Sequence, residues 1–310
     1  MKLSSRIPFR LALKQTPEQR SSSIDTYQRT MLHSNLLRLV ARGGPKRLMS
    51  TATKLTTVEV NDKTGIATLT MNRPPVNSQN VQLLEDLQKS ITEIENNKSR
   101  GLILTSAMSN VFSAGLDIHE MYNTNEERLR IVWTELQNAW IALYGSSLPT
   151  AAAINGHAPA GGCLLATACE YRVMVPNCRI GLNETQLGII APKWLMSGFL
   201  NVLPKRVAER ALTQGRMFTT QEAFEVGLVD EIANSKEEAL EKCSAFIGSF
   251  AKVNSLARGL TKLQFRAENI KEFEKIREKD VANFIALASR PEIQKDMGIY
   301  LENLKKKGKK

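Results

Sequence analysis

Short apolar runs alternate with helical patterns along the middle of the chain, and this alternation limits the fold to the α/β class. Two β-rich runs, 58–60 and 66–71, flank a turn that ends at Gly65, which predicts a β-hairpin. Apolar residues then recur at helical spacing, at Leu84, Leu87, Ile91 and Ile94. Further short strands are predicted at 101–106, 150–154, 171–175 and 179–182. Two more helices are predicted between these strands, one ending near Gly145 and one beginning at Gly161.

Helical patterns dominate the second half of the chain. Beyond Trp194 only one short strand is predicted, at 228–232. Ser235 and Glu238 have the spacing of a capping box in front of the next helix, and Pro291 suits the first turn of the last helix. With 310 residues, 42% of them hydrophobic, the chain can bury a large core. We therefore expect an α/β body followed by a helical C-terminal region.

The net charge of +11 is unevenly distributed. Residues 1–54 hold eleven basic and two acidic side chains, so +9 belongs to this segment and +2 to residues 55–310. No Asp or Glu lies between Thr26 and Val58, where arginines are interspersed with leucines. This composition is typical of a mitochondrial transit peptide, which we place at residues 1–50, and it predicts a location in the mitochondrial matrix. A basic arm without a targeting role is the alternative.

Several classes of function are disfavoured by composition. The four cysteines and three histidines form neither a CxxC pair nor a zinc-ligand spacing, which predicts free thiols in a reducing compartment and no metal site. No run approaches the roughly 18 consecutive apolar residues of a membrane span, so no transmembrane segment is expected. A nearly neutral body with 6% aromatic residues also argues against a nucleic-acid partner.

Two motifs of small residues predict unpaired backbone amides. In the first, 111–118, Gly115 permits unusual dihedral angles and Asp117 can cap the following turn, which leaves the N–H of Leu116 facing outward. The second is a strand–turn–helix junction that leaves the Gly161 amide at a helix N-terminus. Together, two such donors can hold one oxyanion, as in an enolate or a tetrahedral intermediate.

Glu184 is a candidate general base. It is the only carboxylate between Glu170 and Glu209, and its neighbours are apolar or neutral. Apolar surroundings raise the proton affinity of a carboxylate, which suits a base that works near neutral pH. An exposed surface glutamate is the alternative interpretation.

Four segments occur in the order and at the spacing of the crotonase (enoyl-CoA hydratase/isomerase) superfamily, which the chain resembles over about residues 55–304. The segments are FSAGLDI, INGHAPAGGC, GLNETQLGI and ALTQGRMFTTQEAFEVGLVDEI. Within that family, MNRPPVNS, PAGGC and NETQLGIIAP are particularly similar to the Δ3,Δ2-enoyl-CoA isomerase branch. The resemblance implies a superhelical core of repeated ββα turns at 51–250, a helical region at 251–310 that serves oligomerisation, and trimers that can pair into hexamers.

The resemblance also implies roles for individual residues. It places the thioester oxygen between the amides of Leu116 and Gly161, and the adenine end of coenzyme A near the backbone of Ala114. The implied substrate-binding residues are Ala114, Gly115, Leu116, Asp117, Ile118, Gly161 and Asn183. Coenzyme A is part of the substrate, and no separate cofactor is expected.

The carboxylates distinguish the branches of the family. Hydratases of the family carry one glutamate just after the Gly-Gly-Cys of the second motif and another at the position of Glu184, and the first position is Leu164 here. A leucine cannot orient water, whereas one base that takes a proton from C2 and returns it to C4 is sufficient for an isomerase. The resemblance therefore implies that 3-cis- and 3-trans-enoyl-CoA are converted to 2-trans-enoyl-CoA in β-oxidation.

Some alternatives stay open. Another crotonase activity, hydratase or thioester hydrolase, an RNA-binding hydratase-like protein and a catalytically silent relative are the rival functions. Lys262, with Arg266 four residues later, is a possible contact for the phosphates of coenzyme A, and a solvated helix face is its alternative. His119, His157 and Cys163 lie within the motifs, and we interpret them as structural residues.

Overall fold

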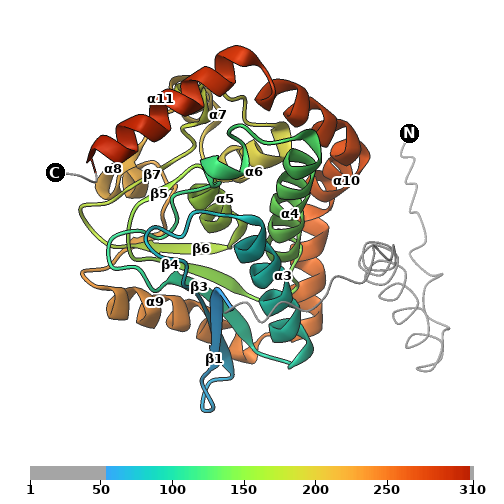
Figure 1. Cartoon of the computed structure of the whole chain (residues 1–310). Helices are drawn as coiled ribbons and strands as arrows, with labels where there is room; N and C mark the ends of the chain where they lie inside the picture. The colour runs from blue at the N-terminus through green and yellow to red at the C-terminus, as the bar shows by residue number, and fades with distance from the viewer. Residues whose placement is uncertain (1–53, 308–310) are drawn as a thin grey trace, which may run out of the picture. The chain divides into compact units, whose positions relative to one another are not determined.

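The computed structural model describes residues 54–307, in which the predicted strands and two short unpredicted ones, at 158–159 and 218–219, form two sheets (Figure 1). The larger sheet has the order β1-β2-β3-β4-β6-β9, with β1 antiparallel to β2 and the other neighbours parallel. Its strands are β1 (Thr56–Val60), β2 (Ile66–Met71), β3 (Gly101–Ser106), β4 (Thr150–Ile154), β6 (Tyr171–Met174) and β9 (Glu231–Ile232). The smaller sheet contains β5 (Ala158–Pro159), β7 (Arg179–Gly181) and β8 (Phe218–Thr219). The predicted transit peptide, residues 1–50, lies outside the described residues.

Helices cover both faces of the larger sheet, which explains why its central strands β3 and β4 are buried along their whole length. One face packs on α9 (Lys236–Gly248) (Figure 1). The other faces α3 (Val81–Asn96), α4 (Glu126–Tyr144) and α5 (Gly161–Ala168). Within β4, Ala151 and Ala153 join the smaller apolar cluster under α9, and Ala152 and Ile154 join the main core. This alternation is the two-residue period of a strand.

The helical C-terminal region is confirmed. Its helices are α6 (Lys193–Val202), α7 (Lys205–Gln214), α8 (Thr220–Glu225), α9, α10 (Ser255–Ala288) and α11 (Pro291–Lys307). The indole N–H groups of Trp133 and Trp194 donate to Asp280 Oδ2 at 2.7 and 2.8 Å, which ties α4 and α6 to α10. Helix α10 packs against α4 and α6, and α11 packs against α10, so the C-terminal helices lie on the helical layer of the body. A role of this region in oligomerisation stays a prediction.

Two local predictions are wrong in detail. The strand expected at 228–232 is limited to β9, because Gly227 adopts φ 81° and the Leu228 amide bonds back to Ala223 to close α8. The capping box at Ser235 is half formed, since Ser235 Oγ accepts from the Glu238 amide but Glu238 reaches the amide of Asn234.

None of the helices within residues 54–307 is both long and apolar enough to span a membrane.

Candidate active site

The Leu116 segment is held so that its own amide stays free. Leu116 pairs with Gln79 in an isolated parallel bridge, in which the Gln79 N–H donates to Gly115 O at 2.7 Å and Gln79 O accepts from the Asp117 N–H at 3.2 Å. In a parallel bridge the residue between the two bonds points its N–H to the opposite side. Gly115, with φ 84°, makes the turn that this requires. The Leu116 N–H accordingly meets no acceptor within residues 54–307.

The Gly161 amide begins α5 and is also free. Ala160, just before the helix, adopts φ 47° and ψ −117°, a strained conformation held by its N–H bond to Gly181 O at 2.8 Å. The first amides of a helix have no partner within it, and the helix dipole makes this end favourable for negative charge. Among the residues that the structure describes, none supplies a side-chain cap at Ala160 or an acceptor for the Gly161 N–H.

The two motifs lie against each other. A Cβ added to Gly115 would lie 3.0 Å from the nitrogen of Gly161, and a Cβ on Gly162 would overlap the carbonyl oxygen of Ser113. Only glycine permits this approach of one backbone to another. Two amide donors that are 45 residues apart in the chain thus come together, as the predicted oxyanion hole requires.

Glu184 is buried, which excludes the surface-glutamate alternative. It begins the short 3₁₀-helix η3 (Glu184–Leu187), 9% of its surface is exposed, and its Oε2 has no hydrogen-bond partner among the described residues. Burial raises the pKa of Glu184 to about 7, against a smaller opposing effect of its own backbone amide. Such a carboxyl group exchanges a proton readily near neutral pH.

The smaller sheet brings Glu184 to the second motif. Strands β5 and β7 are parallel, with Pro159 paired to Gly181, so Gly161 and Glu184 follow within three residues of paired strand ends. The charge of Glu184 is close enough to α5 to contribute, after burial, to the raised pKa of the Cys163 thiol. A fully buried thiol that holds its proton is no nucleophile, which agrees with the structural role expected for Cys163.

Two further predicted substrate-binding residues, Asp117 and Asn183, differ in their local contacts. Asp117 caps the 3₁₀-helix η2 (Ile118–Glu120) and contacts Arg73 Nη2 at 2.8 Å. Burial would raise the pKa of Asp117, but hydrogen bonds from His119 and the charge of Arg73 outweigh it, so the pKa is lowered. Asp117 is therefore an ionised cap. The Asn183 side chain precedes η3, and its buried Oδ1 has no partner in the described part of the chain.

The two histidines do not join the candidate base. The His119 side chain is 71% exposed and bonds to the Asp117 carboxylate at 3.0 Å. His157 Nδ1 accepts the backbone N–H of Arg179 at 3.1 Å. Both contacts are structural, as expected.

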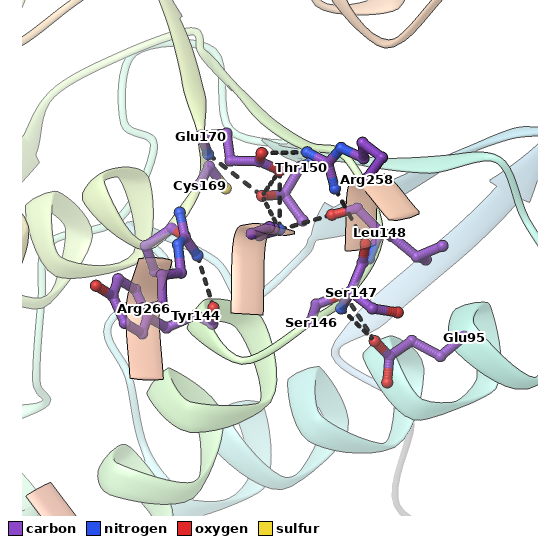
Figure 2. Close-up of polar contacts among 12 residues, drawn as sticks. Glu95, Tyr144, Ser146, Ser147, Leu148, Thr150, Cys169, Glu170, Arg258 and Arg266 are labelled. Carbon is purple, nitrogen blue, oxygen red and sulfur yellow. Dashed lines mark hydrogen bonds and ion pairs between the residues drawn. The ribbon is translucent and has the colours of Figure 1, made fainter. Parts of the chain in front are cut away.

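The position of Lys262 contradicts the solvated-face alternative. Its side chain is 4% exposed, and Nζ contacts Glu170 Oε2 at 2.8 Å and Leu148 O at 2.6 Å. Burial lowers the pKa of Lys262 to about 8, although the Glu170 carboxylate opposes this shift. In Figure 2, Glu170 is shared with Arg258 in the same polar cluster. The ammonium group is bonded to other groups of this chain, so it is not exposed for the predicted contact with the phosphates of coenzyme A.

Arg266 is likewise internal. Its guanidinium donates to Tyr144 O at 2.6 Å and to Ala168 O at 2.9 Å, which are the last residues of α4 and α5 (Figure 2). Helix C-termini present unpaired carbonyl groups that favour cations. The basic pair on α10 therefore anchors this helix to the body of the protein.

The enoyl-CoA hydratase/isomerase family model matches residues 61–309. The chain belongs to this family. Among curated members, enoyl-CoA delta isomerase 1, mitochondrial, of Rattus norvegicus is 41% identical over 273 residues, covering 87% of this chain and 94% of the relative. The Homo sapiens protein of the same name is 43% identical over 251 residues, covering 80% and 83%.

Solved structures of the family confirm the crotonase fold. The crystal structure of human mitochondrial delta3-delta2-enoyl-CoA isomerase superimposes with a TM-score of 0.79 at 41% identity, covering 82% of this chain and 99% of that one. The enoyl-CoA hydratase of Bacillus halodurans gives a TM-score of 0.71 at 23% identity, which shows the shared fold alone.

Proposed function

We propose that this protein isomerises 3-cis- and 3-trans-enoyl-CoA to 2-trans-enoyl-CoA in the β-oxidation of unsaturated fatty acids. The observation that carries the proposal is the buried carboxyl group of Glu184, whose Oε2 has no hydrogen-bond partner within residues 54–307 and which follows the strand paired beside the Gly161 motif. That motif in turn lies against the Leu116 segment. The isomerase names of the curated relatives, which this chain covers over most of their length, support the same activity.

The proposed mechanism needs one base and one oxyanion hole. The Glu184 carboxylate takes a proton from C2 of the 3-enoyl thioester, and the electron pair moves onto the thioester oxygen to form a dienolate. The amides of Leu116 and Gly161 donate to this oxygen as its negative charge develops. Glu184 then returns the proton to C4, the double bond settles between C2 and C3, and the thioester carbonyl forms again.

The substrate contacts follow the same proposal. The backbone from Ala114 to Ile118, with Gly115 and Asp117, lines the thioester and coenzyme A side of the site. The Asn183 side chain offers its Oδ1, which has no partner within residues 54–307, to a substrate donor. Coenzyme A enters as part of the substrate, and the reaction as written uses no separate cofactor.

Leu164 argues against water addition. The Leu164 side chain is 1% exposed and belongs to the main core, so it cannot orient a water molecule for attack on the substrate. We expect the purified protein to convert 3-enoyl-CoA much faster than it hydrates 2-enoyl-CoA, measured side by side by product analysis. Hydration faster than double-bond migration would exclude the isomerase function.

The pH profile should report the raised pKa of Glu184. Because the base acts as the carboxylate, kcat/KM for 3-enoyl-CoA is expected to be constant above about pH 7.5 and to fall about tenfold per pH unit below about pH 6.5. Initial rates between pH 5.5 and 8.5 in buffers of constant ionic strength test this. A profile that is flat down to pH 5.5 would mean that Glu184 is not the base.

The proposed setting is the mitochondrial matrix. The relatives carry mitochondrial names, and the basic segment at 1–50, which has no acidic residue after Asp25, has the composition of a transit peptide. We further propose a homotrimer or a hexamer, with residues 251–310 contributing to assembly, which mass measurement of the mature protein in solution would test.

A further inference from the structure

Gln79 lies between the two halves of the oxyanion hole, although it belongs to neither motif. Its backbone bonds to the residues on either side of Leu116: the Gln79 N–H donates to Gly115 O, and Gln79 O accepts from the Asp117 N–H. These two bonds determine the direction of the Leu116 amide. The main chain of Gln79 therefore holds the first donor of the hole in place.

The side chain of Gln79 is oriented by a short chain of hydrogen bonds. It is completely buried, and its Nε2 donates to Ser113 Oγ at 3.1 Å. Ser113 Oγ donates its own hydrogen to Asn77 O at 2.8 Å, so it can only accept from Gln79. The amide nitrogen of Gln79 thus faces Ser113, and its Oε1 faces the other way.

Gln79 Oε1 lies against the second donor of the hole. A Cβ added to Gly161 would overlap Oε1, so this oxygen occupies the space in which any larger residue at position 161 would place its Cβ. Oε1 has no hydrogen-bond partner within residues 54–307. A buried carbonyl oxygen without a partner costs stability, and an apolar side chain of this size would avoid that cost. Features that reduce stability, such as a buried polar atom without a partner, occur chiefly at functional sites.

We infer that Gln79 is a positioning residue that sets the Gly161 amide relative to the Leu116 amide. The inference rests on the proposed oxyanion hole. Gln79 contacts both parts of the proposed oxyanion hole. Its backbone bonds to the Leu116 segment, and its side chain packs against the start of α5. If the side chain is shortened, the Gly161 amide can move toward the vacated space. The two amides then donate less well to the negative charge that develops on the thioester oxygen in the transition state. Binding of the ground-state thioester is weakened little.

The first test is a pair of substitutions with a matched control. Gln79→Ala is expected to lower kcat about 10- to 100-fold with little change in KM, because small displacements of catalytic groups have effects of this size. Gln79→Leu, which keeps the volume, should lose less. Gln137→Leu is the control, since Gln137 is also completely buried but its Nε2 binds Asp280 at 2.8 Å on α10. The control should lower the melting temperature and leave kcat unchanged.

A double-mutant cycle tests the contact itself. Gly161→Ala alone should be severely impaired because its methyl group meets Gln79, and in the Gln79→Ala background the same change should cost at least tenfold less in kcat. Additive effects, or wild-type kcat in both Gln79 variants, would overturn the inference. If wild-type protein isomerises 3-enoyl-CoA normally while the Gln79 variants match it, only the positioning role fails. If the wild-type protein does not isomerise, the proposed function fails instead.

Discussion

Glutamine in place of Glu184 is expected to lower the turnover of 3-enoyl-CoA by about 10⁴-fold, while the dissociation constant for a CoA thioester changes little. Glutamine keeps the size of the side chain but cannot accept the C2 proton. The oxyanion donors are backbone amides and remain in place. Turnover is measured by 2-enoyl-CoA formation, and binding by titration calorimetry with a saturated acyl-CoA. Near wild-type turnover would refute Glu184 as the base.

Stability provides the control for this variant. The folded protein holds the Glu184 proton up to about pH 7, whereas the ordinary pKa of a glutamate is 4.5. The stability associated with this group is therefore fully present below pH 4.5 and is lost as the pH rises through 7. At pH 8, Glu184→Gln should be more stable than the wild type by about 3 kcal/mol in urea unfolding, and this difference should vanish near pH 4.5. Inactivity combined with lower stability at pH 8 would point to misfolding.

Glu170→Gln serves as the matched comparison because the sign of its pKa shift is opposite. Burial acts to raise the pKa of Glu170, but Lys262 and Arg258 together lower it. Its carboxylate therefore stabilises the fold at pH 8, and glutamine should reduce the free energy of unfolding without changing kcat. The two variants separate a catalytic carboxyl group from a structural one.

Gly115→Ala is expected to lower kcat about 10²- to 10³-fold, the effect of losing one oxyanion donor. Gly115 has φ 84°, which an alanine rarely adopts, and the added Cβ would lie 3.0 Å from both Ala160 Cβ and the Gly161 nitrogen. The two loops must separate to relieve this contact. Steady-state kinetics with 3-enoyl-CoA measure the loss, and circular dichroism establishes that the variant is folded.

Gly248→Ala is the control for this glycine. No atom within the described residues lies within 4 Å of a Cβ at this position, which is the last residue of α9. We expect wild-type kcat and equal or slightly higher thermal stability, because alanine favours a helix. A folded Gly115→Ala enzyme with kcat within a factor of three of the control would show that the approach of the two loops is unimportant for catalysis.

Periodicity and motifs predicted much of the fold and most of the site. The hairpin around Gly65, the buried strands and the helix that begins at Gly161 are all present, because apolar period, glycine turns and helix caps act over a few residues. Glu184 was recognisable as an isolated carboxylate in apolar sequence for the same reason. One local prediction, the capping box at Ser235, is only half formed because the Glu238 carboxylate accepts from the amide of Asn234, one residue before the cap.

Lys262 and Gln79 show what local sequence cannot reveal. Lys262 lies on a long helix with an ordinary mixture of charged and apolar residues. Its burial depends on the Glu170 carboxylate and the Leu148 carbonyl group, which bind its ammonium group and come from other parts of the chain. Gln79 sits in a polar stretch with no motif of its own. Its importance arises from two segments, around Leu116 and Gly161, that are distant along the chain.

The amino-acid sequence by itself determined the α/β class, the family, the candidate base and the two glycine-rich turns, since each depends on residues that are close together in the chain. The tertiary structure decided which amides lie close together, that Glu184 is buried enough to hold its proton to about pH 7, and that Lys262 and Arg266 anchor α10 to the rest of the chain. Those properties depend on desolvation and on contacts between segments brought together only when the sheets and helices pack.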